Sequence, residues 1–160
     1  MKRDQQRSRV YKWEDSLPLT ASGISSGRRC SLKRCRELVD AACDLYNLPK
    51  IYVDKPINPR QTYAAHYNII SVDGESDEIR ISKQLQRQDI ALHEAAHYVT
   101  LKLWPRAIDH GPEFVRVYMH LMHELLGAQM NWLESWARYH GVRFSTHKIY
   151  SPGEKTLSSK

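Results

Sequence analysis

A chain of 160 residues with 41% hydrophobic residues is long enough to bury one core, and its length gives no reason to expect a second domain. An odd number of clustered cysteines, no apolar signal-peptide core near Met1 and no apolar run that could span a membrane exclude disulfide-rich secreted and membrane proteins, and favour the cytoplasm. The net charge of +6 is unevenly placed, because residues 1–36 hold ten Lys or Arg against three Asp or Glu.

The first 29 residues are polar, and serine and glycine follow one another closely near their end. They show no sustained hydrophobic periodicity beyond a short helical stretch at 10–15. We therefore predict that residues 1–29 form a basic flexible arm and linker. Such an arm can bind nucleic acid without sequence preference by neutralising phosphates, and a solvated tail has the same composition, so both interpretations stay open.

The next part of the chain carries periodic patterns. Ser31 is a good N-cap for a helix over 32–47, in which apolar residues recur at helical spacing. Alternation at 51–53 predicts a short strand, and the apolar stretches 63–72 and 79–81 flank a turn-rich segment, which predicts a hairpin. A small sheet is therefore expected to follow the first helix.

Three more helices are predicted in the second half of the chain. One covers 90–103, with Asp89 placed to cap it. Another begins with Pro112, a residue suited to the first helical position, and a last one covers 130–140. A polar C-terminal tail, 146–160, follows.

These elements predict an α+β fold for a single domain spanning residues 30–145. Its order is a helix, a small and mostly antiparallel three-stranded sheet, a second helix and one or two closing helices. We expect one edge of the sheet to border the functional cleft.

The run H-E-A-A-H places His93, Glu94 and His97 on the second of these helices. Residues four apart share one face of a helix, so the two imidazoles can bind a single metal ion, while Glu94 points aside and can act as general base on a water. A chain of this composition contains such a run by chance only about 0.02 times, so chance is a poor explanation.

A catalytic zinc ion needs a third protein ligand and an open position. The candidates downstream are His110, Asp109, Glu113 and Glu124. We favour His110, because it lies just before the helix that begins at Pro112, where the chain can turn back over the first metal ligands. Glu113 is already explained as an acidic residue in the first turn of a helix.

The run H-E-A-A-H, followed after twelve residues by H-G-P-E-F, resembles the SprT-like zinc metallopeptidases, which include the Spartan proteases of DNA–protein crosslink repair. The resemblance covers roughly residues 32–126 and implies a zincin-like minimal metallopeptidase domain. It also implies that His93, His97 and His110 bind Zn2+ and that Glu94 is the catalytic base. More loosely, Arg3 to Glu14 resemble a group of uncharacterised metallohydrolases from actinobacteria and their phages.

Other histidines and tyrosines receive smaller roles. His120 and His123 are interpreted as structural or surface residues, because the position that would complete a second motif is Gly127. Five residues remain candidates for stabilising an oxyanion beside the metal, although core packing also explains each of them: His66, Tyr63, Tyr67, Tyr98 and Tyr118.

We therefore expect a zinc-dependent hydrolase, and specifically a peptidase whose extended polypeptide substrate adds to the sheet edge. Two alternatives stay open from the sequence. The enzyme can be a metallohydrolase that cleaves other amides, or the chain can be a nucleic-acid or host-interaction protein with a structural metal site. A purely structural site has no need of Glu94, which favours catalysis.

Overall fold

The computed structural model of the chain describes residues 4–17, 29–58, 60, 65–68 and 77–146. Within these residues, helices and a three-stranded sheet form an α+β architecture, which confirms the expected class. The elements, in chain order, are α1 (Arg7–Asp15), α2 (Leu32–Leu45), β1 (Tyr52–Asp54), β2 (Ala65–Asn68), β3 (Glu78–Ile81), a short 3-10 helix (Lys83–Leu85), α3 (Gln88–Leu103), α4 (Pro112–Leu126) and α5 (Met130–Tyr139).

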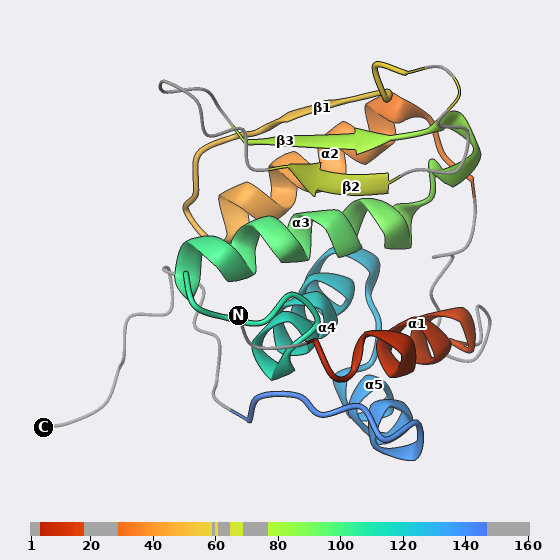
Figure 1. Cartoon of the computed structure of the whole chain (residues 1–160), viewed down its shortest axis with the longest axis vertical. Coiled ribbons are helices and arrows are strands. Elements are labelled where there is room, and N and C mark those ends of the chain that lie inside the picture. Colours follow the sequence, from red (N-terminus) through yellow and green to blue (C-terminus); the bar gives the residue numbers. More distant parts are fainter. Residues whose placement is uncertain (1–3, 18–28, 59, 61–64, 69–76, 147–160) are drawn as a thin grey trace, which may run out of the picture.

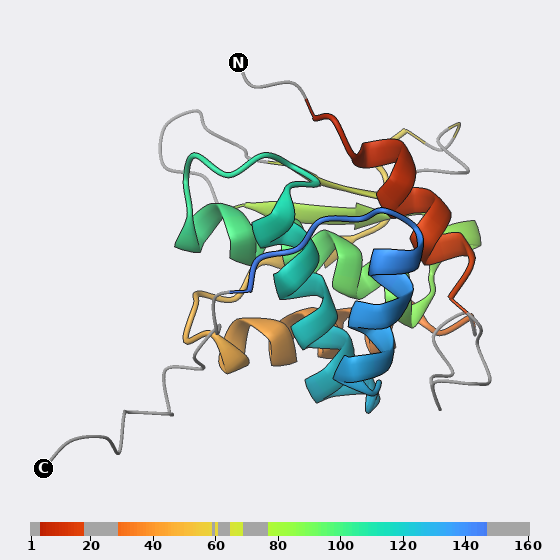
Figure 2. The same ribbon diagram turned by 90° about the horizontal axis from the view of Figure 1, so that it is seen from below.

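Helix α3 lies in the middle of the molecule. It packs against α2, α4 and the strands β2 and β3, and it runs along the sheet beside β2 (Figure 1). Helices α4, α5 and α1 lie on the side of α3 away from the sheet (Figures 1 and 2). Ten residues of α3 are buried, so polar side chains on this helix must find partners inside the protein.

The sheet has the order β1-β3-β2 and is mixed. Strands β2 and β3 pair antiparallel, as the predicted hairpin requires, but β1 runs parallel to β3, so the expectation of a mostly antiparallel sheet is only half right. The physical reason is burial: Ile79 and Ile81 are fully buried, so the strand that carries them takes the central position between β1 and β2. Because β1 and β2 run in opposite directions, a strand between them must be parallel to one of them. Among the described residues, this order leaves β2 with one unpaired edge, on the side of α3.

Two helix ends follow directly from local chemistry. The side chain of Ser31 accepts a hydrogen bond from the Arg34 N–H at the start of α2, and Gly127 ends α4 in the left-handed conformation, with φ 74°. The prediction that Asp89 caps α3 is wrong, because Arg87 is the N-cap residue. Asp89 lies in the first turn of α3, where its carboxylate pairs with the Arg87 guanidinium.

The N-terminal segment differs from the predicted flexible arm over its described residues 4–17. These residues form α1, whose Val10 and Trp13 are fully buried in the core. The Trp13 ring meets the Tyr118 ring edge-on, with centroids 5.9 Å apart. One helix of 9 residues shows too few apolar positions for its periodicity to predict that it packs.

The remaining termini and linkers lie largely outside the described residues. These are 1–3 and 18–28 of the predicted arm and linker, and 147–160 of the predicted tail. Nucleic-acid binding by the arm therefore stays a prediction. No helix among the described residues is both long and apolar enough to cross a lipid bilayer.

Truncation of Trp13 tests whether α1 belongs to the folded domain. We expect Trp13→Ala to lower the free energy of unfolding by about 3–5 kcal/mol, because it removes a fully buried aromatic side chain and leaves a cavity. Urea unfolding measures the change, and Tyr139→Ala, at a residue that is 76% exposed, is the matched control. A loss no larger than that of the control would contradict the packing of α1.

Candidate metal centre

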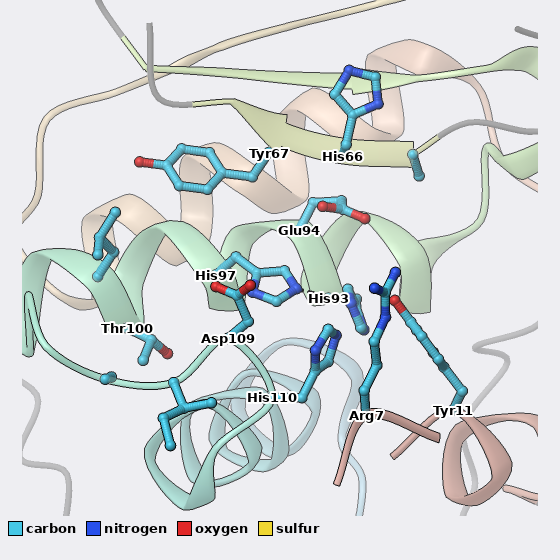
Figure 3. A pocket seen from close by; sticks show the side chains of 14 residues that line it. Arg7, Tyr11, His66, Tyr67, His93, Glu94, His97, Thr100, Asp109 and His110 are labelled. Carbon is cyan, nitrogen blue, oxygen red and sulfur yellow. Dashed lines mark hydrogen bonds between the residues drawn. The ribbon is translucent and has the colours of Figure 1, made fainter. Parts of the chain in front are cut away.

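Two imidazoles project from successive turns of α3 toward one point. The Nε2 atoms of His93 and His97 lie 3.1 Å apart, and their ring centroids are 4.9 Å apart. This closeness follows from the spacing of four residues on a helix. Glu94, the residue between them in the motif, leaves α3 on another side and projects toward β2 (Figure 3).

A third imidazole comes from the loop between α3 and α4. The loop turns tightly, since the Gly111 N–H donates to the Ile108 carbonyl at 2.8 Å, and a Cβ at Gly111 would lie only 2.9 Å from that oxygen. The turn directs His110 at the two imidazoles of α3, with its ring centroid 4.8 Å from that of His97 (Figure 3). One potential ligand atom from each of the three histidines lies within 4.8 Å of the others.

The structure distinguishes among the four candidates for the third ligand. His110 joins the pair on α3, whereas Asp109 is exposed at the rim of the cavity and Glu113 lies in the first turn of α4. Glu124 lies near the other end of α4, where its carboxylate is 3.8 Å from each of His120 and His123. Among the described residues, only the three histidines form a group that can hold a metal ion.

Carboxylates from the N-terminal segment hold two of these imidazoles. Glu14 Oε1 lies 2.6 Å from His93 Nδ1, and Asp4 Oδ2 lies 2.7 Å from His110 Nδ1. A carboxylate can only accept, so each Nδ1 carries the proton and each Nε2 presents a lone pair. His110 Nε2 is buried and has no hydrogen-bond partner among the described residues. A buried nitrogen of this kind is a suitable ligand for a metal cation.

Burial lowers the pKa of both His97 and His110. Burial, together with the neighbouring His93 and His110, holds the pKa of His97 well below its usual value. The pKa of His110 is lowered mainly by burial, against the opposing effect of the hydrogen bond that the ring donates to Asp4. Both imidazoles are thus neutral near pH 7, the form that binds metals.

Glu94 sits in a different environment from the other carboxylates. It is 6% exposed, and burial raises its pKa to about 7, against the opposing charge of His93 and a hydrogen bond from the backbone of Tyr67. A carboxylate with a pKa near neutrality can both accept and return a proton, which suits general acid–base catalysis.

The histidines and Glu94 line one cavity of about 420 Å³. Strand β2 forms one wall with Ala65, His66 and Tyr67, and the opposite wall comes from α1 and the loop 107–110 (Figure 3). The cavity is open to solvent at its rim. A substrate can therefore reach the histidines between the edge of the sheet and α1.

The tyrosines proposed near the metal fall into different places. Tyr98 donates its hydroxyl hydrogen bond to the Pro49 carbonyl, and Tyr118 donates to the Asp89 carbonyl, so both are engaged away from the cavity. Tyr67 lines the cavity, and Tyr63 lies outside the described residues. His66 also lines the cavity, but its ring turns away from the three histidines (Figure 3).

Two further histidines have the structural roles expected of them. His120 Nδ1 lies 2.6 Å from the Tyr46 hydroxyl, and His123 Nδ1 lies 2.6 Å from the Ala128 carbonyl. Both sit on α4 and neither lines the cavity. They are therefore separate from the metal centre.

Sequence reasoning missed four residues of the site, all from the N-terminal segment. They are Asp4, Arg7, Tyr11 and Glu14. The only available signal was the resemblance of Arg3 to Glu14 to uncharacterised metallohydrolases, which assigned these positions no chemistry. Comparisons with family models, with curated proteins and with solved structures found no match to the chain. Its function must be inferred from the residues of the site.

The carboxylate at Glu14 should set the affinity of the centre for a metal. We expect Glu14→Gln to weaken binding of Zn2+ by about 10- to 100-fold, because the neutral amide no longer fixes the orientation and basicity of His93. Competition with a chelator of known affinity measures the change. The control is Asp15→Asn, at the exposed carboxylate of the next residue. Equal affinities for the two variants would contradict this role.

Burial of Glu94 should make the metal-free protein sensitive to pH. Its pKa is raised from 4.5 to about 7, so the folded state keeps a proton that the unfolded chain releases between these values. Wild type should therefore lose stability relative to Glu94→Gln as the pH rises through this window. Urea unfolding of both proteins in chelator, at several pH values, gives the difference. A difference that does not vary with pH would show that the pKa is ordinary.

Proposed function

We propose that the chain is a zinc-dependent hydrolase, and specifically a metallopeptidase that cleaves extended polypeptides. The observation that carries the proposal is the convergence of three imidazoles beside Glu94, a buried carboxylate whose pKa is raised to about 7. The group lies in a cavity that a substrate can enter. A metal with only a structural role would not require an open cavity or a carboxylate poised near neutrality.

Zinc fits this donor set best. Three imidazoles plus one open position are a common catalytic zinc site, and hydrogen bonds from ligand imidazoles to carboxylates usually accompany it. Imidazole nitrogens around a tetrahedral zinc lie about 3.3 Å apart, close to the 3.1 Å between the two Nε2 atoms on α3. Zinc bound in this way supplies a Lewis acid that lowers the pKa of a neighbouring water to about 7.

Glu94 is the residue that moves protons in this proposal. Its carboxylate accepts the proton of the attacking water and returns it to the leaving amine, which requires a pKa close to the working pH. His93, His97 and His110 would hold the ion through their imidazole nitrogens. Glu14 and Asp4 keep two of these rings in place.

The unpaired edge of β2 supports a polypeptide as the substrate. Among the strands that the structure describes, β2 pairs only with β3, and its residues form a wall of the cavity. An extended peptide can pair with this edge and place a carbonyl above the histidines. The mixed sheet beside the metal helix, together with the two sequence motifs, supports a zincin-like domain of the SprT type.

Two substitutions separate catalysis from metal binding. We expect Glu94→Gln to lower hydrolysis of an unfolded protein by about 10²- to 10⁴-fold, because the amide cannot accept a proton, while zinc content stays near that of wild type and the melting temperature does not fall. In contrast, His97→Ala should lose zinc, and its melting temperature should no longer rise when zinc is added.

Zinc analysis, thermal melts and a cleavage assay on the same preparations make this comparison. If the Glu94→Gln variant hydrolyses the substrate at the rate of wild type, this result would contradict a catalytic role for Glu94 and favour a structural metal. Zinc-dependent hydrolysis of simple amides without cleavage of polypeptides would favour the other class of metallohydrolase.

A further inference from the structure

The wall of the cavity opposite β2 is built by α1, and two of its side chains face the histidines. Arg7 and Tyr11 rise from α1 beside His93 and His110 (Figure 3), and both line the same cavity as Glu94. The proposed mechanism gives neither of them a role. Their position, across the cavity from the strand edge, is one that a bound polypeptide would touch.

This wall is held in place firmly. The Gln6 side chain, just before α1, donates to the carbonyls of His110 at 2.7 Å and of Arg143 at 3.0 Å. Trp13 is fully buried, and Glu14 is bonded to His93. Groups on α1 are therefore already positioned before a ligand arrives, which lowers the entropic cost of binding.

Arg7 forms no ion pair with an acidic side chain among the described residues, although the charges of Asp4 and Asp109 act on it from a distance. Within the part of the chain that the structure describes, no carboxylate lies within 4.0 Å of its guanidinium, whereas Arg87 and Arg116 are each paired with one. Its partner is Tyr11. The hydrogen bond with the Tyr11 hydroxyl raises the pKa of Arg7, and the guanidinium carbon lies 5.5 Å from the ring centroid.

A guanidinium that is hydrogen-bonded to a tyrosine is suited to bind a carboxylate. The planar fork of donors fits the two oxygens of a carboxylate, and an adjacent hydroxyl can donate a further hydrogen bond. The position of Arg7 at the exposed rim suits a group on the substrate, whereas an oxyanion of the reaction would form deeper, beside the histidines.

We propose that Arg7 and Tyr11 form a subsite for a carboxylate of the polypeptide substrate, so that the enzyme prefers peptides with an acidic group beside the cleaved bond. This inference rests on the proposed function. The carboxylate comes either from an aspartate or glutamate side chain or from the C-terminus of the peptide. The chemistry of recognition is the same for both sources.

Hydroxamates test the subsite without hydrolysis, because a hydroxamate binds zinc and its other end can carry the carboxylate. The probes are acetohydroxamic acid, the monohydroxamates of succinic, glutaric and adipic acids, and the methyl esters of these three. Calorimetry gives their dissociation constants for the zinc-loaded wild type, Arg7→Gln and Tyr11→Phe. The control is Lys12→Gln, which removes an exposed charge from the same helix.

At least one acid should bind wild type about tenfold more tightly than its ester, a gain typical of one exposed charge-assisted pair. The gain should vanish in Arg7→Gln, shrink in Tyr11→Phe and persist in Lys12→Gln, while affinity for the esters stays unchanged. Acids and esters of equal affinity in wild type, or a gain that survives in Arg7→Gln, would overturn the subsite. Failure of every hydroxamate to bind would instead contradict the zinc centre, and the subsite with it.

Matched peptides then identify the source of the carboxylate. Each cleaved peptide is compared with a version carrying asparagine for aspartate or glutamine for glutamate, and with a version amidated at its C-terminus. A fall of about tenfold in kcat/KM that is seen with wild type but not with Arg7→Gln identifies the source of the carboxylate. In the first comparison this source is the acidic side chain, and in the second it is the C-terminus. No fall in either comparison would overturn the preference.

Discussion

The structure depends on one constraint: a helix buried on nearly every side carries two imidazoles and a carboxylate. Polar groups inside a protein need partners, and each one left unpaired costs about 1–3 kcal/mol. Helix α3 meets this demand by facing its histidines toward His110 and by pairing His93 with the Glu14 carboxylate, while Asp4 holds His110. The cluster that remains presents imidazole lone pairs to one another, an arrangement that a cation stabilises.

Helix α1 serves the core and the site at the same time. Its buried face, with Val10 and Trp13, packs into the domain. Its residues Arg7 and Tyr11 line the cavity, and Glu14 bonds His93. Stability and metal geometry are therefore linked through one short element. A change that loosens α1 acts on the orientation of His93 as well as on the core.

The order of the strands connects the fold to the proposed chemistry. Because β3 takes the central position, β2 keeps a free edge within the described part of the chain, and that edge lies beside α3, where the histidines converge. The position of β1 on the far side of β3 is thus more than a detail of topology. It leaves β2 available to an extended chain at the place where Glu94 projects.

The sequence by itself determined the features that depend on neighbouring residues. The spacing of His93 and His97, the cap at Ser31 and the start of α4 at Pro112 are all local, and each was predicted. The choice of His110 was also within reach, since it lies close along the chain. Only the tertiary structure decided the parallel strand pair, the docking of α1 and the carboxylate partners. Asp4 and Glu14 lie 106 and 79 residues from the histidines that they bind, and contacts over such separations leave no periodic pattern in a sequence.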